Sequence, residues 1–143
     1  MPGEWHNSME ALFPEELREF PIICPNTGKT RRADIALTSD CNLEIQHTYI
    51  ACDEVNSRLD DWSECGRSII WLIDGNESVI MDETSDGYMI EYYKHWKYNS
   101  FRKYDHVLLE ISGYIYKISP NEIRSGMIKV KNRIPLETVI DTL

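Results

Sequence analysis

The spacing of apolar residues in the first part of the chain predicts one helix followed by three short strands. From residue 4 to residue 19, apolar side chains recur three and four positions apart with Glu and Arg between them, which is typical of a helix. Pro14 would divide that helix into two short pieces. Three further runs are apolar or alternate between apolar and polar positions, and turn residues bound each of them, as expected for strands. They are residues 20–24, 31–37 and 43–50.

A second helix and a fourth strand follow. Residues 53–65 place Val55 and Trp62 on one helical face, and Gly66 is a typical helix stop. Residues 68–73 are apolar throughout, which favours a strand that is covered on both faces. The predicted order is therefore helix, three strands, helix and strand, an αβββαβ arrangement of the α/β (α+β) class.

The remaining chain gives weaker signals, and we expect it to extend the same domain. Its predicted elements are an edge strand at 78–81, a partly helical segment at 89–104, a hairpin at 106–119 and a terminal helix at 135–143. The hairpin would turn at Ser112-Gly113, and Pro135 would begin the last helix. Because no segment has the composition of a linker, we expect one domain over residues 1–143 with a core at about 3–75.

Composition fits a single globular domain and reveals an uneven distribution of charge. The chain has 143 residues, is 42% hydrophobic and carries a formal net charge of −9. Residues 1–91 hold 6 basic and 19 acidic side chains, whereas residues 92–143 hold 9 basic and 5 acidic ones. The acidity argues against a protein that coats nucleic acid or binds anionic membranes with its whole surface. The basic second part keeps a local nucleic-acid contact open.

Several classes of protein are not expected from this sequence. No apolar run approaches the roughly 20 residues that span a bilayer. The N-terminus is acidic and has no apolar core, so it does not resemble a secretory signal. The cysteines lack the CxxC spacing of zinc and redox sites, and we expect four free thiols in an intracellular, cytoplasmic protein. They are Cys24, Cys41, Cys52 and Cys65.

The two alternating runs around residue 40 bring together the most informative polar residues. If the runs pair as an antiparallel hairpin that turns near Asp40, the numbers of paired residues add up to about 80. Asp34, Glu44 and Gln46 then share one face, with neighbouring side chains about 5–8 Å apart. Two carboxylates at this distance suit a hard cation such as Mg²⁺. The alternative is a hairpin with an ordinary solvated polar face.

Five short strings, in order, resemble the PD-(D/E)XK nuclease superfamily and, more narrowly, the competence protein CoiA nuclease-like family. The likeness covers about residues 3–75. The strings are Glu4-Trp5-His6 with Leu12-Phe13-Pro14, Arg32-Ala33-Asp34-Ile35, Glu44-Ile45-Gln46-His47-Thr48, Glu54 to Arg58, and Ile70-Trp71-Leu72-Ile73-Asp74-Gly75.

This resemblance implies a restriction-endonuclease-like fold with a metal-dependent phosphodiesterase site. Asp34 and Glu44 would bind Mg²⁺ or Mn²⁺, and Glu4 would be a further acid ligand or proton carrier. Gln46 stands where the wider superfamily often has Lys, and the narrower family also has Gln there. Gln carries no positive charge to offset the negative charge that builds up on a phosphate, so the sequence leaves open whether the site turns over substrate.

Other residues favour contact with a nucleic acid, and each of them also has a plainer interpretation. Thr48 shares the face of Gln46, and Arg58 could contact a phosphate or simply pair with Glu54 on its helix. Residues 92–104 interleave aromatic and basic side chains, which is typical of single-strand binding but also of a helix that packs its aromatics inward. The basic residues are Lys94, Lys97, Arg102 and Lys103.

Two histidines near these residues have open roles. His6 and Glu10 are four residues apart and could bind a metal or form an exposed helix pair. His47 points away from the face of Gln46, so it is either a buried, hydrogen-bonded histidine or a catalytic one.

The sequence therefore favours a metal-dependent nuclease that acts on DNA, in processing or recombination. The first alternative is a catalytically weak or inactive nucleic-acid-binding module on the same fold. The second alternative is a protein-interaction domain that does not bind nucleic acid. No membrane partner is expected.

Overall fold

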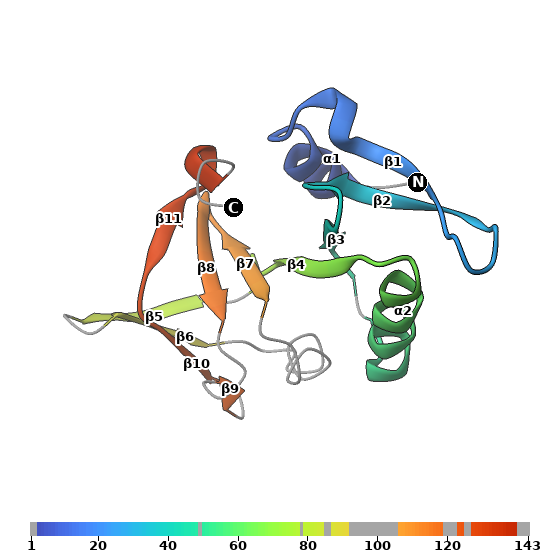
Figure 1. Cartoon of the computed structure of the whole chain (residues 1–143). Coiled ribbons are helices and arrows are strands. Elements are labelled where there is room, and N and C mark those ends of the chain that lie inside the picture. Colours follow the sequence, from blue (N-terminus) through green and yellow to red (C-terminus); the bar gives the residue numbers. More distant parts are fainter. Residues whose placement is uncertain are drawn as a thin grey trace.

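The computed structural model describes residues 3–48, 50–77, 79–84, 87–91, 106–118, 123–124 and 127–139. Their strands form two sheets, and the helices are few and short (Figure 1). In chain order the elements are α1 (Glu4–Glu10), the 3-10 turn η1 (Glu15–Leu17), β1 (Arg18–Ile23), β2 (Thr30–Ala36), β3 (Cys41–Gln46), α2 (Cys52–Glu64), β4 (Ser68–Asp74), β5 (Val79–Thr84), β6 (Gly87–Glu91), β7 (Val107–Ile111), β8 (Tyr114–Ile118), β9 (Ile123–Arg124), β10 (Met127–Val130), β11 (Arg133–Pro135) and the 3-10 turn η3 (Leu136–Thr138).

The large sheet has seven strands in the order β1-β2-β3-β4-β7-β8-β11. Its centre, β3-β4-β7, is parallel, and the neighbouring pairs on both sides are antiparallel. Met9 of α1 packs with Leu43 and Leu72 on one face, whereas Val55 and Trp62 of α2 pack with Trp71 on the other face. The central strands are therefore covered on both sides, as the apolar run of β4 predicts.

The first part of the chain follows the predicted αβββαβ order, with one correction. The helix expected over residues 4–19 ends at Glu10, and residues 18–23 form the edge strand β1. Pro14 lacks a backbone N–H and has an extended backbone conformation, so the helix cannot continue through it. The following residues then pair with β2, where Phe20 lies opposite Ala33.

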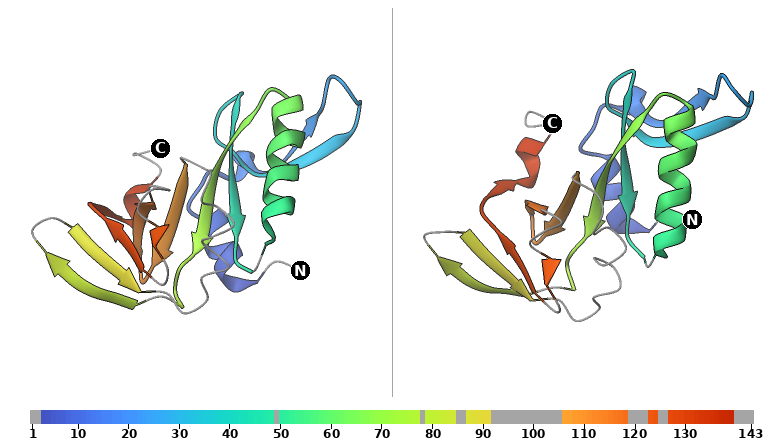
Figure 2. Two further views of the ribbon diagram at one scale, coloured as in Figure 1. Left: turned by 90° about the horizontal axis from the view of Figure 1, so that it is seen from below. Right: turned by 60° about the horizontal axis from the view of Figure 1, so that its bottom comes forward.

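The second part of the chain contains a small sheet that the sequence pattern does not predict, in the order β5-β6-β10-β9. It lies at the opposite end of the molecule from the β1–β2 hairpin (Figures 1 and 2). The expected helical character of residues 89–104 is wrong for residues 89–91, which belong to β6 and pair with β10. The other residues of that segment lie outside the described part. The edge strand predicted near residues 78–81 is present as β5.

The C-terminal elements are partly as predicted. The hairpin of β7 and β8 turns at Ser112 and Gly113, whose positive φ angles of 48° and 87° suit a two-residue hairpin turn. The helix expected over residues 135–143 is wrong for residues 135–138, because Pro135 is the last residue of β11 and Leu136–Thr138 form the 3-10 turn η3. Val139 is helical, and residues 140–143 lie outside the described part. None of the helices described here is long and apolar enough to cross a membrane.

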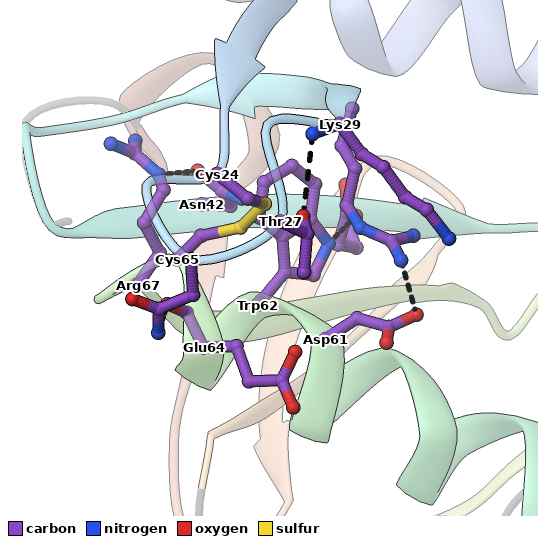
Figure 3. The surroundings of a disulfide bond; sticks show 12 residues. Cys24, Thr27, Lys29, Asn42, Asp61, Trp62, Glu64, Cys65 and Arg67 are labelled. Carbon is purple, nitrogen blue, oxygen red and sulfur yellow. Dashed lines mark hydrogen bonds and ion pairs between the residues drawn. A yellow bond between two sulfur atoms is a disulfide. The ribbon is translucent and has the colours of Figure 1, made fainter.

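A disulfide corrects the expectation of four free thiols. Cys24, near the tip of the β1–β2 hairpin, is bonded to Cys65, which directly follows α2 (Figure 3). The same two elements are joined by an ion pair between Arg31 and Asp61 at 3.0 Å. The hairpin tip is thus fixed to the end of α2 by one covalent bond and one charged contact. The free cysteines are Cys41 and Cys52.

Candidate metal centre

Asp34 and Glu44 lie close together on neighbouring strands. The β2–β3 ladder pairs Ile35 with Leu43, which is close to the predicted register, and Asp34 and Glu44 are the next residues on the two strands. The predicted common face is wrong for this pair, because Glu44 bonds to Trp62 of α2 and Asp34 lies against His6 of α1, and these helices cover opposite sides of the sheet. The N–H of Asp34 donates to Oε2 of Glu44 at 3.0 Å, and the N–H of Ile45 donates to Oδ2 of Asp34 at 2.7 Å. Each carboxylate thus occupies a place that a backbone carbonyl would take in a regular ladder.

Glu44 is buried on the side of the sheet that α2 covers. Its exposed fraction is 6%, and Nε1 of Trp62 donates to its Oε1 at 2.9 Å. Burial and the nearby charge of Asp34 raise the pKa of Glu44 to about 7, although the hydrogen bonds and Arg58 act in the opposite direction. The positive charge and hydrogen bonds around Glu44 are therefore too few to offset the cost of burying its ionised carboxylate.

The carboxylate of Asp34 faces α1 and β1, where three further polar side chains converge. Nε2 of His6 lies 3.6 Å from Oδ1 of Asp34, and Nδ1 of His6 lies 3.6 Å from Oε1 of Glu10. Glu19 joins them from β1. One ligand atom from each of these four residues lies within 4.8 Å of the others, so they could hold a metal ion. We call His6, Glu10, Glu19 and Asp34 the four-residue cluster.

The four-residue cluster concentrates negative charge in a place with little solvent. The side chains of His6 and Glu10 are 14% and 13% exposed. Nδ1 of His6 and Oε1 of Glu10 are buried and have no hydrogen-bond partner in the described part of the chain. Burial, a hydrogen bond with Glu19 and the charges of Glu19 and Asp34 raise the pKa of Glu10 to about 8. Burial also raises the pKa of Asp34.

The donor atoms fit a divalent cation. Carboxylate oxygens are the ligands that Mg²⁺ and Mn²⁺ prefer, and an imidazole nitrogen is common among Mn²⁺ and Zn²⁺ ligands. A bound cation would offset the charge that raises the pKa values of Glu10 and Asp34. Nδ1 of His6 and Oε1 of Glu10 are buried without a hydrogen-bond partner among the described residues, and each of them would gain a partner by binding the ion.

Glu19 has an unusual backbone conformation for a strand residue. Its φ angle is +46°, which costs a residue with a side chain about 1–2 kcal/mol. The neighbouring pairs Arg18–Ile35 and Phe20–Ala33 bracket Glu19 and Asp34, so the two acidic residues lie across from each other. The strain thus occurs where the chain brings a third carboxylate to the cluster, a pattern that is common at functional sites.

The other predicted site residues in the described part of the chain are not members of this cluster. Glu4 is exposed in the first turn of α1 and does not belong to the cluster. Gln46 is half-buried at the end of β3, and its side-chain amide donates to the carbonyl of the exposed Thr48 at 2.9 Å. Arg58 forms the helix pair with Glu54 at 3.2 Å, and its charge also lowers the pKa values of Asp34 and Glu44.

The four basic residues that are predicted to contact nucleic acid lie outside the described residues. They are Lys94, Lys97, Arg102 and Lys103.

Sequence reasoning finds part of the cluster and misses one member. The spacing of His6 and Glu10 identifies them as a possible metal pair, and the structure adds that both are largely buried. The sequence does not single out Glu19, because the helix expected over residues 4–19 would place this side chain among solvated charges. The sequence signal that could have revealed it is Pro14, which makes a helix through residue 19 unfavourable.

Comparison of the chain with protein-family models, curated proteins and solved structures finds no match.

Proposed function

We propose that the protein is a metal-dependent, nuclease-like phosphodiesterase with a restriction-endonuclease-like core, and that DNA is its substrate. The observation that carries the proposal is the four-residue cluster at β1, β2 and α1, together with the carboxylate of Glu44 on β3, which accepts a hydrogen bond from the N–H of the cluster residue Asp34. The αβββαβ order of the elements is compatible with that core. The ordered strings that resemble the CoiA nuclease-like family add to the proposal.

In this function the acidic residues would hold Mg²⁺ or Mn²⁺. Asp34 would be the shared ligand, since its carboxylate contacts Ile45 of β3 and His6 of α1. Glu44 would bind beside it. The ion would supply an activated water molecule and stabilise negative charge on the phosphate. Gln46, two residues beyond Glu44, would orient water or phosphate through its amide group.

The second candidate is a nucleic-acid-binding module that turns over slowly or not at all. Gln46 favours it, because its amide is neutral and already donates to the carbonyl of Thr48. A Lys at this position would offset charge that builds up on the phosphate, and Gln cannot. The net charge of −9 also limits affinity for DNA.

The test combines cleavage with metal binding. Single-stranded, duplex and branched DNA would be incubated with the protein and Mg²⁺ or Mn²⁺, and Mn²⁺ affinity would be measured by calorimetry. We expect metal-dependent cleavage that is lost in Asp34→Asn and Glu44→Gln. The exposed Glu16→Gln in η1 is the matched control, and it should cleave DNA and bind Mn²⁺ like the unchanged protein.

Each other result selects a different function. Cleavage that persists in both site variants contradicts the proposed metal centre. Salt-dependent binding without cleavage supports the binding module. No measurable DNA affinity at low salt supports the protein-interaction domain instead.

A cytoplasmic location is part of the proposal and can be tested through the disulfide. Disulfides are rare in the cytosol, where thiol systems keep cysteines reduced. Rapid alkylation of thiols in cells would show whether Cys24 and Cys65 are bonded there. A cytoplasmic protein should be alkylated at both cysteines, whereas protection of both would argue for an oxidising compartment.

A further inference from the structure

A second row of polar residues lies at the carboxyl ends of the three parallel strands. Gln46 pairs with Ile73, so His47 comes next to Asp74, and Asp74 pairs with Glu110 of β7. These residues alternate with Gln46 and Ile73 and therefore face the side of the sheet that α1 covers. The carboxyl ends of parallel strands are a frequent place for ligands and catalytic groups. None of the residues in this row belongs to the proposed metal centre.

Asp74 fixes His47 from the edge of the ring. Oδ2 of Asp74 lies 2.7 Å from Nδ1 of His47. The other oxygen, Oδ1, accepts hydrogen bonds from the backbone N–H of Asn76 at 3.0 Å and from its side-chain amide at 2.7 Å. Asp74 is 7% exposed, so its carboxylate has one well-defined position. An ionised carboxylate can only accept, which places the proton on Nδ1 and leaves Nε2 with a lone pair.

Trp5 fixes the same ring from its face. The rings of Trp5 and His47 are stacked with their centroids 5.8 Å apart. Nε1 of Trp5 points to Oε1 of Glu110 at 3.4 Å, and the side-chain amide of Asn76 contacts both oxygens of Glu110 at 3.1 and 3.2 Å. Asp74 from β4 and the neutral Trp5 from α1 thus contact His47 directly, and Glu110 from β7 contacts Trp5 and Asn76.

His47 nevertheless remains open to solvent. Its side chain is 51% exposed, although Nδ1 and one ring face have partners. A histidine with only a structural role would more often be covered. The combination of an oriented ring and an accessible Nε2 is the arrangement that general acid–base catalysis requires.

The position of His47 also relates it to the four-residue cluster. The N–H of Ile45 lies 2.7 Å from Oδ2 of Asp34. Ile45 and His47 face the same side of the sheet and are two residues apart, which separates them by about 7 Å along the strand. One water molecule and one phosphate group fit within such a distance.

We propose that His47 is a general base in the hydrolysis of a phosphodiester and that Asp74 is its positioning residue. The proposal rests on the function proposed above. Nε2 takes a proton from water as the water oxygen forms a bond to phosphorus. The bond from phosphorus to the leaving oxygen then breaks. The proton held by the imidazolium passes to that oxygen, directly or through solvent, so the net reaction consumes one water molecule.

The first test measures cleavage in variants of this pair. We expect His47→Ala to lower kcat by about 10²–10⁴-fold with Mn²⁺ affinity unchanged, and added imidazole to restore part of the rate. Asp74→Asn should lower kcat less and shift the acidic limb of the pH–rate profile. The exposed His106→Gln is the matched control and should cleave normally. An unchanged kcat in His47→Ala, or a reduced kcat that imidazole does not restore, overturns the proposal.

The second test needs neither cleavage nor metal. Diethyl pyrocarbonate labels accessible neutral imidazoles, and mass spectrometry measures the rate at each histidine. At pH about 8 we expect His47 to react faster than His106, and this advantage to disappear in Asp74→Asn because the carboxylate holds the proton on Nδ1 and leaves the lone pair on Nε2. Equal rates for His47 in both proteins overturn the oriented histidine even if DNA is cleaved. If the pattern appears but the unchanged protein does not cleave DNA, the proposed function fails while the oriented histidine stands.

Discussion

At the scale of single residues, Glu44 and Glu10 make stability depend on pH in an unusual direction. Their pKa values are about 7 and about 8 in the folded protein, against an ordinary value of 4.5. The folded state therefore binds more protons than the unfolded state between pH 4.5 and about 8, and its stability decreases as pH rises through this window. For the well-buried Glu44 the slope can reach about 1.4 kcal/mol per pH unit.

Urea unfolding in the presence of EDTA would check this dependence. We expect a lower free energy of unfolding at pH 8.5 than at pH 5.5, and a smaller difference in Glu44→Gln. Saturating Mn²⁺ should also reduce the difference, since a cation takes the place of the protons. Glu16→Gln should behave like the unchanged protein. An equal difference in Glu44→Gln would contradict the raised pKa.

The hydrogen bond between Trp62 and Glu44 gives a second prediction at this scale. Trp62→Phe removes the N–H donor from a buried carboxylate, which should destabilise the protein by about 1–3 kcal/mol. Repeating the substitution in Glu44→Met, which has no oxygen acceptor, forms a double-mutant cycle, and denaturant unfolding of the four proteins measures the coupling. We expect a coupling free energy of more than about 0.5 kcal/mol, and additive effects would rule out the bond as a stabilising contact.

The strained backbone of Glu19 gives a third prediction. Glu19→Gly should raise the stability of the metal-free protein by about 1 kcal/mol, because glycine adopts a φ of +46° without the clash of a side chain. It should weaken Mn²⁺ binding at the same time. Glu19→Gln keeps the strain and removes the charge, so comparing the two unfolding free energies separates the causes. Equal stability of the two variants would mean that the strain is small.

At the scale of elements, the disulfide determines how firmly the β1–β2 hairpin is held against α2. Cys24 and Cys65 are 41 residues apart in sequence, and closing a loop of this length stabilises the folded state by about 4 kcal/mol in the chain-entropy treatment. We expect the double variant Cys24→Ser, Cys65→Ser to unfold at a lower temperature than the oxidised protein.

Two comparisons make that prediction specific to the disulfide. Reducing agent should lower the Tm of the unchanged protein but not of the double variant. Replacing the free Cys41 and Cys52 with Ser should leave the effect of the reducing agent intact. A Tm that does not respond to reduction would show that contacts such as the Arg31–Asp61 pair suffice to hold the hairpin.

The elements that could be predicted from sequence are those with local causes. The β2–β3 hairpin, α2 and the β7–β8 hairpin have alternation, helical spacing or turn residues within their own segments. Residues 89–91 become a strand because β10, a segment distant in sequence, pairs with them. A pattern within one segment does not contain that information.

The same division explains which site residues could be found. Asp34 and Glu44 are brought together by a short hairpin, so the register alone predicts their contact. Glu19 also meets Asp34 within a hairpin, but the helix expected over residues 4–19 hides that contact. Asp74 reaches His47 through the parallel pairing of β3 with β4 across α2, and the Cys24–Cys65 bond likewise joins segments distant in sequence. The pattern of a single sequence does not indicate which distant segments will pair.

At the scale of the whole molecule, the uneven charge predicts how any DNA binding should respond to salt. Residues 92–143 carry the excess of basic side chains, and four of them alternate with aromatics. Replacing Lys94, Lys97, Arg102 and Lys103 with Gln should weaken binding at low salt. It should also reduce the slope of log affinity against log salt by about 0.9 for each phosphate that the variant no longer neutralises.

Titration of a fluorescent oligonucleotide at several salt concentrations measures both quantities. Lys117→Gln, an exposed change on β8, is the control and should keep the slope of the unchanged protein. If the fourfold variant also keeps that slope, the DNA contact lies elsewhere.

The disulfide has one more consequence, which concerns covalent topology. The bond between Cys24 and Cys65 closes the intervening chain into a ring, and Asp34, Glu44 and His47 all lie on that ring. A single break of the backbone within the ring would leave both products attached to each other. The two carboxylates would then remain on one covalent body, whereas a break after Asp74 would separate β4 from β7.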